Sequence, residues 1–249
     1  MSVSHINDSL SLTPSQTIEW PIAILAGGLA TRLKPLTNTI PKSLIMIHDE
    51  PFIGHQMRLL KQQAFQNIVI CVGHLGTMIE RYLGNGNQFG LNIQYSYERH
   101  GLLGTGGAII KALPLLGEEF FVLYGDSYLP CNYHCVQQTF RESQRLGLMT
   151  VFANDNQGIP SNVEFEKGQI LAYNKEYATS NMKYVDYGLG VFNRAVFSDF
   201  PPETPIDLVE VYQTQLKRNQ LAGFEIFEPF YEIGSLRGIE AFKQYMGRN

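Results

Sequence analysis

The sequence predicts an α/β fold, in which a doubly wound, mostly parallel mixed sheet is flanked by helices and joined by a smaller part built of hairpins. Short apolar runs, of the kind that form strands buried on both faces, alternate with helical patterns from residue 22 onward. Such alternation is typical of parallel sheets, which bind ligands at the carboxyl ends of their strands. From residue 159 the strand-like segments follow one another through turns, which favours hairpins.

The first part of the chain supplies most of the alternating elements. Its predicted strands are short apolar or alternating runs at 22–26, 43–47, 68–72, 91–97, 120–124 and 148–153. Its predicted helices lie at 52–64, 77–83, 104–113 and 132–146. Residues 1–18 are rich in Ser, Thr, Asn and Gln and are expected to form a flexible arm.

The second part is less regular. A tight turn at Lys167-Gly168 separates two of its predicted strands. The strands of this part are expected at 162–166, 169–173, 184–192 and 223–227, and its helices at 207–216 and 236–245. The last helix has an apolar face that we expect to complete the core.

Composition and charge narrow the functional classes. The chain of 249 residues carries a net charge of −4, which is unlike the basic balance of a nucleic-acid-binding protein. No apolar run is long enough to span a membrane, and the N-terminus lacks signal-peptide features, so we expect a cytoplasmic location. Cys131, His134 and Cys135 lack a fourth ligand, so free thiols are expected there and not a zinc site.

The segment from Trp20 to Leu44 is the candidate for phosphate binding. Two glycines, Gly27 and Gly28, follow the first buried strand, so the backbone there can approach a ligand closely. Arg32, Lys34 and Lys42 follow, and no Asp or Glu lies between Trp20 and His48. Uncompensated cations on a glycine-rich loop suit a polyphosphate. The residues alone also fit an ordinary strand-to-loop turn with solvated charges.

A longer string adds a resemblance. The sequence LAGGLATRLKPLT, followed by PKSL, resembles the signature of the nucleotidyltransferases that join a sugar 1-phosphate to a nucleoside monophosphate. Ala30 stands where that family normally has glycine. The resemblance extends over roughly residues 21 to 244 and is most similar to short, single-domain heptose 1-phosphate guanylyltransferases and N-acetylmuramate 1-phosphate uridylyltransferases.

The resemblance implies a Rossmann-like fold in which different parts of the chain bind the nucleotide and the sugar. Residues 19–249 would form one domain, with a nucleotide-binding part at 19–153, a sugar-binding part at 154–235 and a C-terminal helix at 236–249. The glycines at 104, 106 and 107 would leave backbone amides bare at a helix start, which suits a base, ribose or phosphate. A flexible turn is the alternative. The implied nucleotide-binding residues are Leu25, Ala26, Gly27, Gly28, Thr31, Arg32, Gly104, Thr105 and Gly106.

Two carboxylates are candidates for holding Mg²⁺, the implied cofactor. Asp126 follows directly after a buried strand, and the glycine-aspartate pair at this position is the family's principal metal ligand. Tyr124 stands where the family often has Asn. Glu232 lies in FYEIGS, which resembles the family's W-x-D-x-G-T, so a longer side chain replaces its second metal-binding Asp. A lone Asp after a strand also serves as a helix cap.

The candidate sugar-binding residues lie in the hairpin part. Asn174-Lys175 resembles the family's Glu-Lys pair, whose glutamate meets sugar hydroxyls and whose lysine meets the sugar phosphate. Glu164 and Asp186 are further candidates for accepting hydrogen bonds from sugar hydroxyls, although solvated strand carboxylates are commoner.

The implied reaction is attack of a sugar 1-phosphate oxygen on the α-phosphorus of a nucleoside triphosphate, with pyrophosphate leaving. No general base is needed because a phosphate monoester is already anionic at neutral pH. The catalytic residues would be Arg32, Lys42, Asp126 and Lys175. The expected partners are a nucleoside triphosphate and a sugar 1-phosphate, with no nucleic acid and no membrane, and a homo-oligomer is compatible with the sequence.

Within this class we favour a D-glycero-D-manno-heptose 1-phosphate guanylyltransferase. The alternatives are another sugar-1-phosphate uridylyl-, thymidylyl- or cytidylyltransferase, or a non-catalytic relative that binds a nucleotide sugar. Ala30, Asn174 and Glu232 motivate the non-catalytic reading, and the retained cations oppose it. A glycosyltransferase would require a D-x-D motif, which the nearest candidate at 155–157 lacks.

Overall fold

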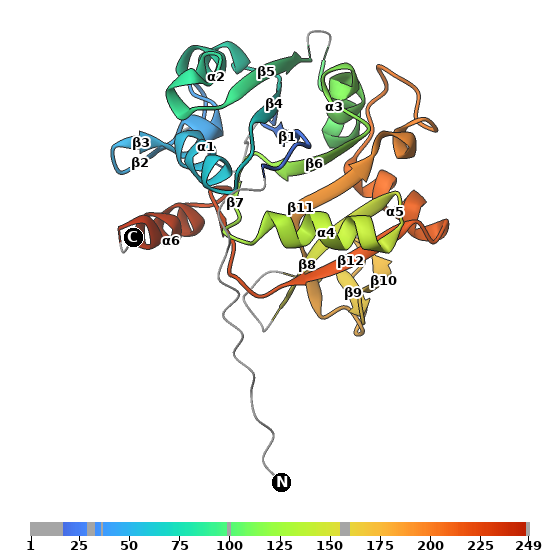
Figure 1. Cartoon of the computed structure of the whole chain (residues 1–249). Coiled ribbons are helices and arrows are strands. Elements are labelled where there is room, and N and C mark those ends of the chain that lie inside the picture. The colour runs from blue at the N-terminus through green and yellow to red at the C-terminus, as the bar shows by residue number, and fades with distance from the viewer. Residues whose placement is uncertain (1–16, 29–32, 36, 99–100, 155–159, 248–249) are drawn as a thin grey trace.

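A computed structural model describes residues 17–28, 33–35, 37–98, 101–154 and 160–247 of the protein. In this part of the chain a single sheet of nine strands runs through the molecule in the order β5-β4-β1-β6-β11-β8-β12-β10-β9 (Figure 1). Its strands are β1 (Ile22–Leu25), β4 (Asn67–Val72), β5 (Asn92–Tyr97), β6 (Glu119–Tyr124), β8 (Gly147–Ala153), β9 (Val163–Glu166), β10 (Gln169–Tyr173), β11 (Tyr184–Asn193) and β12 (Leu221–Ile226). The predicted mixed α/β fold is therefore confirmed.

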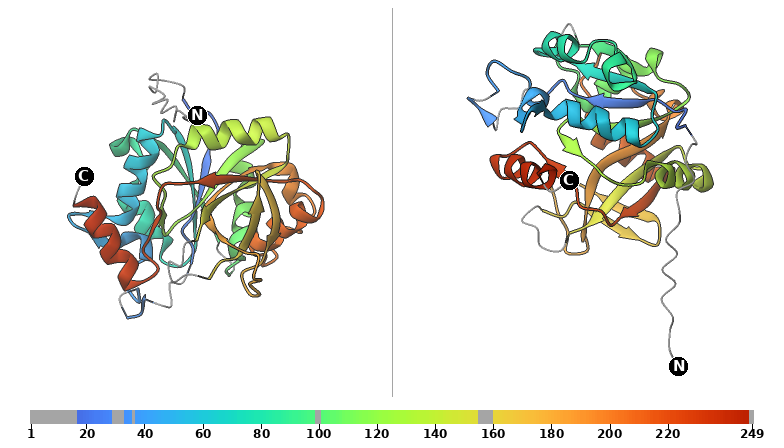
Figure 2. Two further views of the ribbon diagram at one scale, coloured as in Figure 1. Left: turned by 90° about the horizontal axis from the view of Figure 1, so that it is seen from below. Right: turned by 60° about the vertical axis from the view of Figure 1, so that its left-hand side comes forward.

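Helices cover both faces of this sheet (Figure 2). Alternate residues of a strand point to opposite faces, so Ile22 and Ile24 of β1 join one apolar cluster and Ala23 joins another. The first cluster packs against α1 (Phe52–Gln62), α2 (Gly76–Leu83) and α4 (Tyr133–Ser143), and the second against α3 (Gly104–Ala112) and α5 (Leu208–Lys217). The strands are buried on both sides, as their near-continuous apolar runs indicate.

The parallel half of the sheet holds the first four strands in its order. β1 pairs in parallel with β4 on one side and β6 on the other, with Ile24 opposite Ile70 and Leu123. β5 extends this half as a parallel neighbour of β4. The carboxyl ends of these four strands therefore meet at one edge of the molecule, which is where an open α/β sheet binds its ligands.

The predicted hairpins are continuous with the same sheet. β9 and β10 are joined by Lys167 and Gly168, whose φ angles of 49° and 80° fit the twist of a two-residue hairpin. β9 also pairs with β11 through Val163 and Tyr184, so β11, β8, β12, β10 and β9 close into a ring. The hairpin part is thus a curled end of the main sheet.

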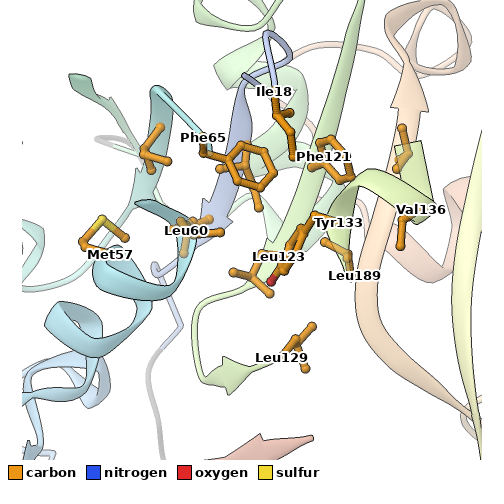
Figure 3. Packing of buried hydrophobic residues seen from close by; sticks show 14 of the residues in the cluster. Ile18, Met57, Leu60, Phe65, Phe121, Leu123, Leu129, Tyr133, Val136 and Leu189 are labelled. Atoms are coloured by element: carbon orange, nitrogen blue, oxygen red, sulfur yellow. The ribbon is translucent and has the colours of Figure 1, made fainter. Parts of the chain in front are cut away.

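The first core cluster reaches into the segment predicted to be an arm. Ile18 is fully buried, and its amide donates to the Ala64 carbonyl at 3.1 Å. Figure 3 shows Ile18 beside Phe65 and Phe121, with Tyr133 below them. Ile18 therefore anchors the chain because its apolar side chain fills the core, which corrects the inclusion of residue 18 in the arm predicted at 1–18. Residues 1–16 lie outside the described residues.

Short elements surround the sheet. The strand predicted at 43–47 is instead a turn of 3₁₀ helix, η2 (Lys42–Leu44), followed by the shorter strand β2 (Met46–Ile47). β2 pairs with β3 (Glu50–Pro51), and β7 (Ser127–Tyr128) pairs with β13 (Tyr231–Glu232). The 3₁₀ turns η3 (Asn87–Phe89), η4 (Leu113–Leu115) and η5 (Arg194–Phe197) complete the connections.

The last helix, α6 (Leu236–Met246), packs back onto the first part of the chain. Its Ile239 and Phe242 are buried in a third cluster with Ile47 and Phe52. Figure 2 shows α6 lying below α1 and next to the β2–β3 hairpin. The apolar face of α6 completes the core, as the sequence predicts.

Candidate active site

A cavity of about 240 Å³ opens at the carboxyl edge of the parallel strands. Its walls come from the segments that follow β1, β5 and β6, from η2 and from the start of α3. Six of the predicted nucleotide-binding residues line it, namely Leu25, Ala26, Gly27, Gly28, Gly104 and Thr105. Ala30, Thr31 and Arg32 lie outside the described residues, as does the segment 155–157.

The two glycines after β1 have different surroundings. A Cβ atom on Gly27 would lie 2.6 Å from Oε2 of Glu98 and 3.2 Å from the Gly73 nitrogen, so a side chain there would displace the Glu98 carboxylate and crowd the Gly73 backbone. A Cβ atom on Gly28 would meet no heavy atom of the described structure within 4 Å. Gly27 is thus needed for packing, and Gly28 presents open backbone beside the cavity.

Glu98 is a cavity-lining residue that the predicted site does not contain. It follows directly after β5, and its Oε1 accepts a hydrogen bond from the Leu103 amide at 2.6 Å. Burial raises the pKa of this carboxyl, and the Leu103 amide and Lys111 oppose that shift. Its place just past a predicted strand end is the sequence signal that identifies it.

The start of α3 is occupied by another part of the chain. The Ile206 carbonyl accepts hydrogen bonds from the Gly106 and Gly107 amides at 2.8 and 3.1 Å, and the Thr105 hydroxyl oxygen accepts one from the Leu208 amide at 2.7 Å. A Cβ atom on Gly104 would lie 2.5 Å from the Ile206 oxygen. The expectation of bare amides at 106 and 107 is therefore wrong. These glycines let the segment before α5 cross the helix start.

Lys42, Asp126 and Glu232 converge at the other side of the cavity. Nζ of Lys42 lies 2.7 Å from Oδ2 of Asp126, and both side chains are partly exposed. β13 pairs with β7 so that Glu232 lies opposite Ser127, next to Asp126 in sequence. A Cβ atom on Gly234 would lie 2.6 Å from Oε2 of Glu232, 3.5 Å from Oδ2 of Asp126 and 3.7 Å from Nζ of Lys42.

This arrangement fits a magnesium site. One oxygen of each carboxylate lies within 3.5 Å of the position that a Cβ atom on Gly234 would take, and Mg²⁺ in nucleotide sites is held by one or two carboxylates together with substrate phosphates. Glu232 accepts hydrogen bonds from the Gly234 amide and, at 2.6 Å, from the Ser235 hydroxyl, which fixes the direction of its longer side chain. The described residues contain no group of three or more His, Cys, Asp or Glu side chains placed to hold a metal.

Lys175 is held by aromatic rings. Its Nζ lies 5.1 Å from the ring centroid of Tyr124 and 5.9 Å from that of Tyr173. The same atom lies 3.3 Å from the Tyr124 hydroxyl and 3.8 Å from Oδ2 of Asp186. These contacts tie the hairpin part to the end of β6, so Lys175 stands beside the residue that lines the cavity.

The predicted hydroxyl acceptors have other partners. Asp186 is only 3% exposed, its Oδ2 accepts from the Tyr173 hydroxyl and its Oδ1 from the Gly188 amide. Oδ1 of Asn174 accepts from the amides of Glu176 and Tyr177. Both oxygen sets are therefore used within the fold, which corrects the expected role of Asp186 and of the Asn174 oxygen as free acceptors. Glu164 is half-buried on β9, and its role stays a prediction.

Tyr124, which the predicted site also omits, connects the two parts. It ends β6 and lines the cavity. Burial and the nearby carboxylates of Asp186, Asp207 and Asp126 raise its pKa well above the ordinary value, so the phenol is protonated at neutral pH.

Comparison with known proteins identifies the family. The family model described as nucleotidyl transferase matches residues 22–200. The chain belongs to this family. The residues that line the cavity, from Leu25 to Asp126, fall within the match, and Glu232 lies outside it.

Named relatives act on different sugars and bases. The chain is 44% identical over 117 residues to N-acetylmuramate alpha-1-phosphate uridylyltransferase of Neisseria meningitidis, covering 47% of this chain and 51% of the relative. It is 27% identical over 212 residues to D-glycero-alpha-D-manno-heptose 1-phosphate guanylyltransferase of Campylobacter jejuni, covering 85% and 93%. It is 28% identical to UTP--glucose-1-phosphate uridylyltransferase of Synechocystis, covering 74% and 52%. The matches to the Neisseria and Synechocystis proteins thus span about half of those proteins.

Solved structures share the fold. HddC from Yersinia pseudotuberculosis, complexed with GMP-PN, superposes with a TM-score of 0.77 at 21% identity, covering 91% of this chain and 99% of HddC. Within the described residues, no helix is both long and apolar enough to cross a membrane.

Proposed function

We propose that the protein transfers a nucleoside monophosphate from a nucleoside triphosphate to a sugar 1-phosphate and releases pyrophosphate. The observation that carries this proposal is the geometry of one cavity edge. The open backbone at Gly28, the Lys42–Asp126 ion pair and Tyr124 with its neighbour Lys175 all lie at this edge. A phosphate-binding loop and two separate lysines suit two phosphorylated substrates that must meet.

The residues would act by position and charge. Lys42 would neutralise charge on the triphosphate, and Lys175 would hold the phosphate of the sugar. Thr31 and Arg32 are proposed to bind the triphosphate alongside Lys42. The attacking phosphate oxygen is anionic already, so the chain needs only to align it with the α-phosphorus and to stabilise the departing pyrophosphate.

Asp126 and Glu232 are proposed to hold Mg²⁺. The ion would supply positive charge to the phosphate oxygens. Lys42 contacts Asp126 directly, so its ammonium and the ion would share the negative charge of one carboxylate.

The finer assignment is a D-glycero-D-manno-heptose 1-phosphate guanylyltransferase. It is supported by the relative from Campylobacter jejuni, which matches over 93% of its own length. The Neisseria relative favours uridylyl transfer to N-acetylmuramate 1-phosphate as the second candidate, because its identity is higher over a shorter stretch. Residues 19–153 would bind the nucleotide, 154–235 the sugar and 236–249 form the helix that braces the site; a cytoplasmic enzyme is proposed.

Pyrophosphate release tests the proposal. The protein is incubated with Mg²⁺, each of the four ribonucleoside triphosphates or dTTP, and sugar 1-phosphates that include heptose, N-acetylmuramate, glucose and mannose. We expect turnover with one preferred pair. Lys42→Ala should lower kcat about a hundredfold, since one preorganised cation is worth on the order of 3 kcal/mol in the transition state.

The matched control is Lys167→Ala, whose side chain is 88% exposed in a hairpin turn and should leave kcat unchanged. Normal turnover by Lys42→Ala would contradict the assignment of the site. Triphosphate binding without turnover across the whole panel would favour a non-catalytic nucleotide-sugar-binding protein.

A further inference from the structure

Tyr124 is fixed between the two parts of the proposed site. It is the last residue of β6 and precedes the Gly125-Asp126 pair. On β11, Gly188 adopts a φ of 102°, and a Cβ atom there would lie 3.4 Å from Cδ2 of the Tyr124 ring. The ring therefore packs closely on a strand that has no side chain at this point, and it also lies below the Lys175 ammonium. Its hydroxyl has little freedom to move away from Lys175.

The Tyr124 hydroxyl can both donate and accept a hydrogen bond, and only its acceptor role is used in the contact with Lys175. An ammonium group has donors only, so the Tyr124 oxygen must accept in its 3.3 Å contact with Lys175. A phenol also carries a hydrogen, and the described residues show no hydrogen bond in which Tyr124 donates it. Asp186, a carboxylate near both groups, accepts from the Tyr173 hydroxyl and lies 3.8 Å from Nζ of Lys175. The Tyr124 hydrogen is thus available to an oxygen atom in the cavity that Tyr124 lines.

We propose that Tyr124 is a substrate-binding residue that donates its phenolic hydrogen to the phosphate group of the acceptor, beside Lys175. This inference rests on the proposed transfer to a sugar 1-phosphate. The Lys175 ammonium and the Tyr124 hydroxyl lie 3.3 Å apart, so they can donate to two oxygens of one phosphate group. A single sugar hydroxyl has only one oxygen and cannot accept from both in this way. The acceptor class that follows is a phosphate monoester whose dianionic group is gripped by one charged and one neutral donor.

Tyr124→Phe tests the inference because it keeps the ring and removes only the hydroxyl. With the preferred substrate pair, we expect KM for the sugar 1-phosphate to rise about tenfold, while KM for the nucleoside triphosphate stays within twofold. A change in packing alone would not single out one substrate. Equilibrium dialysis with the labelled sugar 1-phosphate should show the same weakening in the absence of chemistry.

Tyr187→Phe is the matched control. Tyr187 is buried on β11, its hydroxyl lies beside the Cys131 thiol, and it is not among the residues that line the cavity, so its loss should leave both KM values unchanged. If Tyr124→Phe leaves both KM values within twofold, or raises both equally, or raises only KM for the triphosphate, the inference is overturned. Those outcomes leave the proposed function intact, whereas absence of turnover by the wild-type protein across the panel contradicts the proposed function itself.

Discussion

Glu232 shows how one side chain depends on its local partners. Its carboxylate accepts from the Gly234 amide and the Ser235 hydroxyl, and a Cβ atom on Gly234 would lie close to both this carboxylate and that of Asp126. These two hydrogen bonds hold the Glu232 side chain, which is one methylene longer than aspartate, in one conformation. A glutamate in this geometry can still share a cation with Asp126.

Removal of the proposed Mg²⁺ should stop the proposed transfer. We expect EDTA to abolish pyrophosphate release and added Mg²⁺ to restore it. Glu232→Gln, which keeps one oxygen but no charge, should raise the Mg²⁺ concentration for half-maximal activity about tenfold, and Asp126→Asn should lower kcat about a hundredfold. Activity in EDTA, or a Glu232→Gln variant with an unchanged Mg²⁺ titration, would contradict the role of this pair.

Glu98 provides a test of pH dependence at the same scale. Burial raises its pKa in the folded state, so the folded protein binds this proton more tightly than the unfolded chain does. The contribution of this protonated carboxyl to the stability of the folded protein is complete below the ordinary pKa of about 4.5, and it is lost as the pH rises through the raised pKa.

Comparison with Glu98→Gln isolates this effect, because glutamine keeps an oxygen for the Leu103 amide. From pH 4.5 toward pH 7, we expect the free energy of unfolding of the wild-type protein to fall relative to that of Glu98→Gln. Chemical denaturation at several pH values measures the difference. A difference that is constant or rises with pH would show that the carboxyl is not destabilised by burial.

At the scale of elements, the segment before α5 packs across the start of α3, where Gly104 and Thr105 line the cavity. Gly104 has a φ of 72°, and a Cβ atom on it would clash with the Ile206 carbonyl that accepts from two amides of α3. Gly104→Ala should therefore lower the free energy of unfolding by about 2 kcal/mol and raise KM for the triphosphate.

Gly117→Ala is the control for this substitution. Gly117 is exposed, and its nearest neighbour to a new Cβ atom is 4.0 Å away, so the change in stability should stay within about 0.5 kcal/mol. Urea denaturation compares the two variants. Equal stability of both would mean that the Ile206 crossing yields to the added methyl group without cost.

The elements themselves follow closely from sequence periodicity, because buried parallel strands and amphipathic helices are local patterns. β4 and α1 lie within three residues of their predicted bounds. The predicted strand at 43–47 fails where Ile45 donates to the Lys42 carbonyl and closes a 3₁₀ turn. Local patterns do not show such competition between hydrogen bonds.

The site is less predictable than the elements, because its side chains find partners far away in the chain. Asp186 sits on a strand like a solvent-facing acid, yet it is buried against Tyr173. The amides of Gly106 and Gly107 are paired by Ile206, about a hundred residues later. Such long-range pairing leaves no local trace, whereas the position of Asp126 at the cavity follows from its place just after β6.

On the scale of the whole molecule, the C-terminal segment packs against the first part of the chain beside the candidate site. β13 pairs with β7, and the Ile233 amide donates to the Asp126 carbonyl at 3.0 Å. α6 then starts at once, capped by Ser235, and lays Phe242 against Phe52 of α1. We therefore expect the position of Glu232 to depend on α6, which is anchored by the packing of Phe242 against α1.

Phe242→Ala tests this dependence. Phe242 is fully buried, with ring centroids of Phe52 and Tyr128 at 5.2 and 4.8 Å, so its loss should cost 3 to 5 kcal/mol, about the usual range for a core phenylalanine. Leu236→Ala, at a side chain that is 73% exposed on the same helix, should change stability by less than about 0.5 kcal/mol.

A second measurement separates bracing from stability alone. Under conditions where Phe242→Ala is still folded, we expect it to need about threefold more Mg²⁺ for half-maximal activity than Leu236→Ala, because a loosened α6 no longer holds the turn after Glu232 in place. A folded Phe242→Ala variant with a normal Mg²⁺ requirement would show that β13 alone positions Glu232. α6 would then be a stabilising cover whose packing is independent of the chemistry at Asp126.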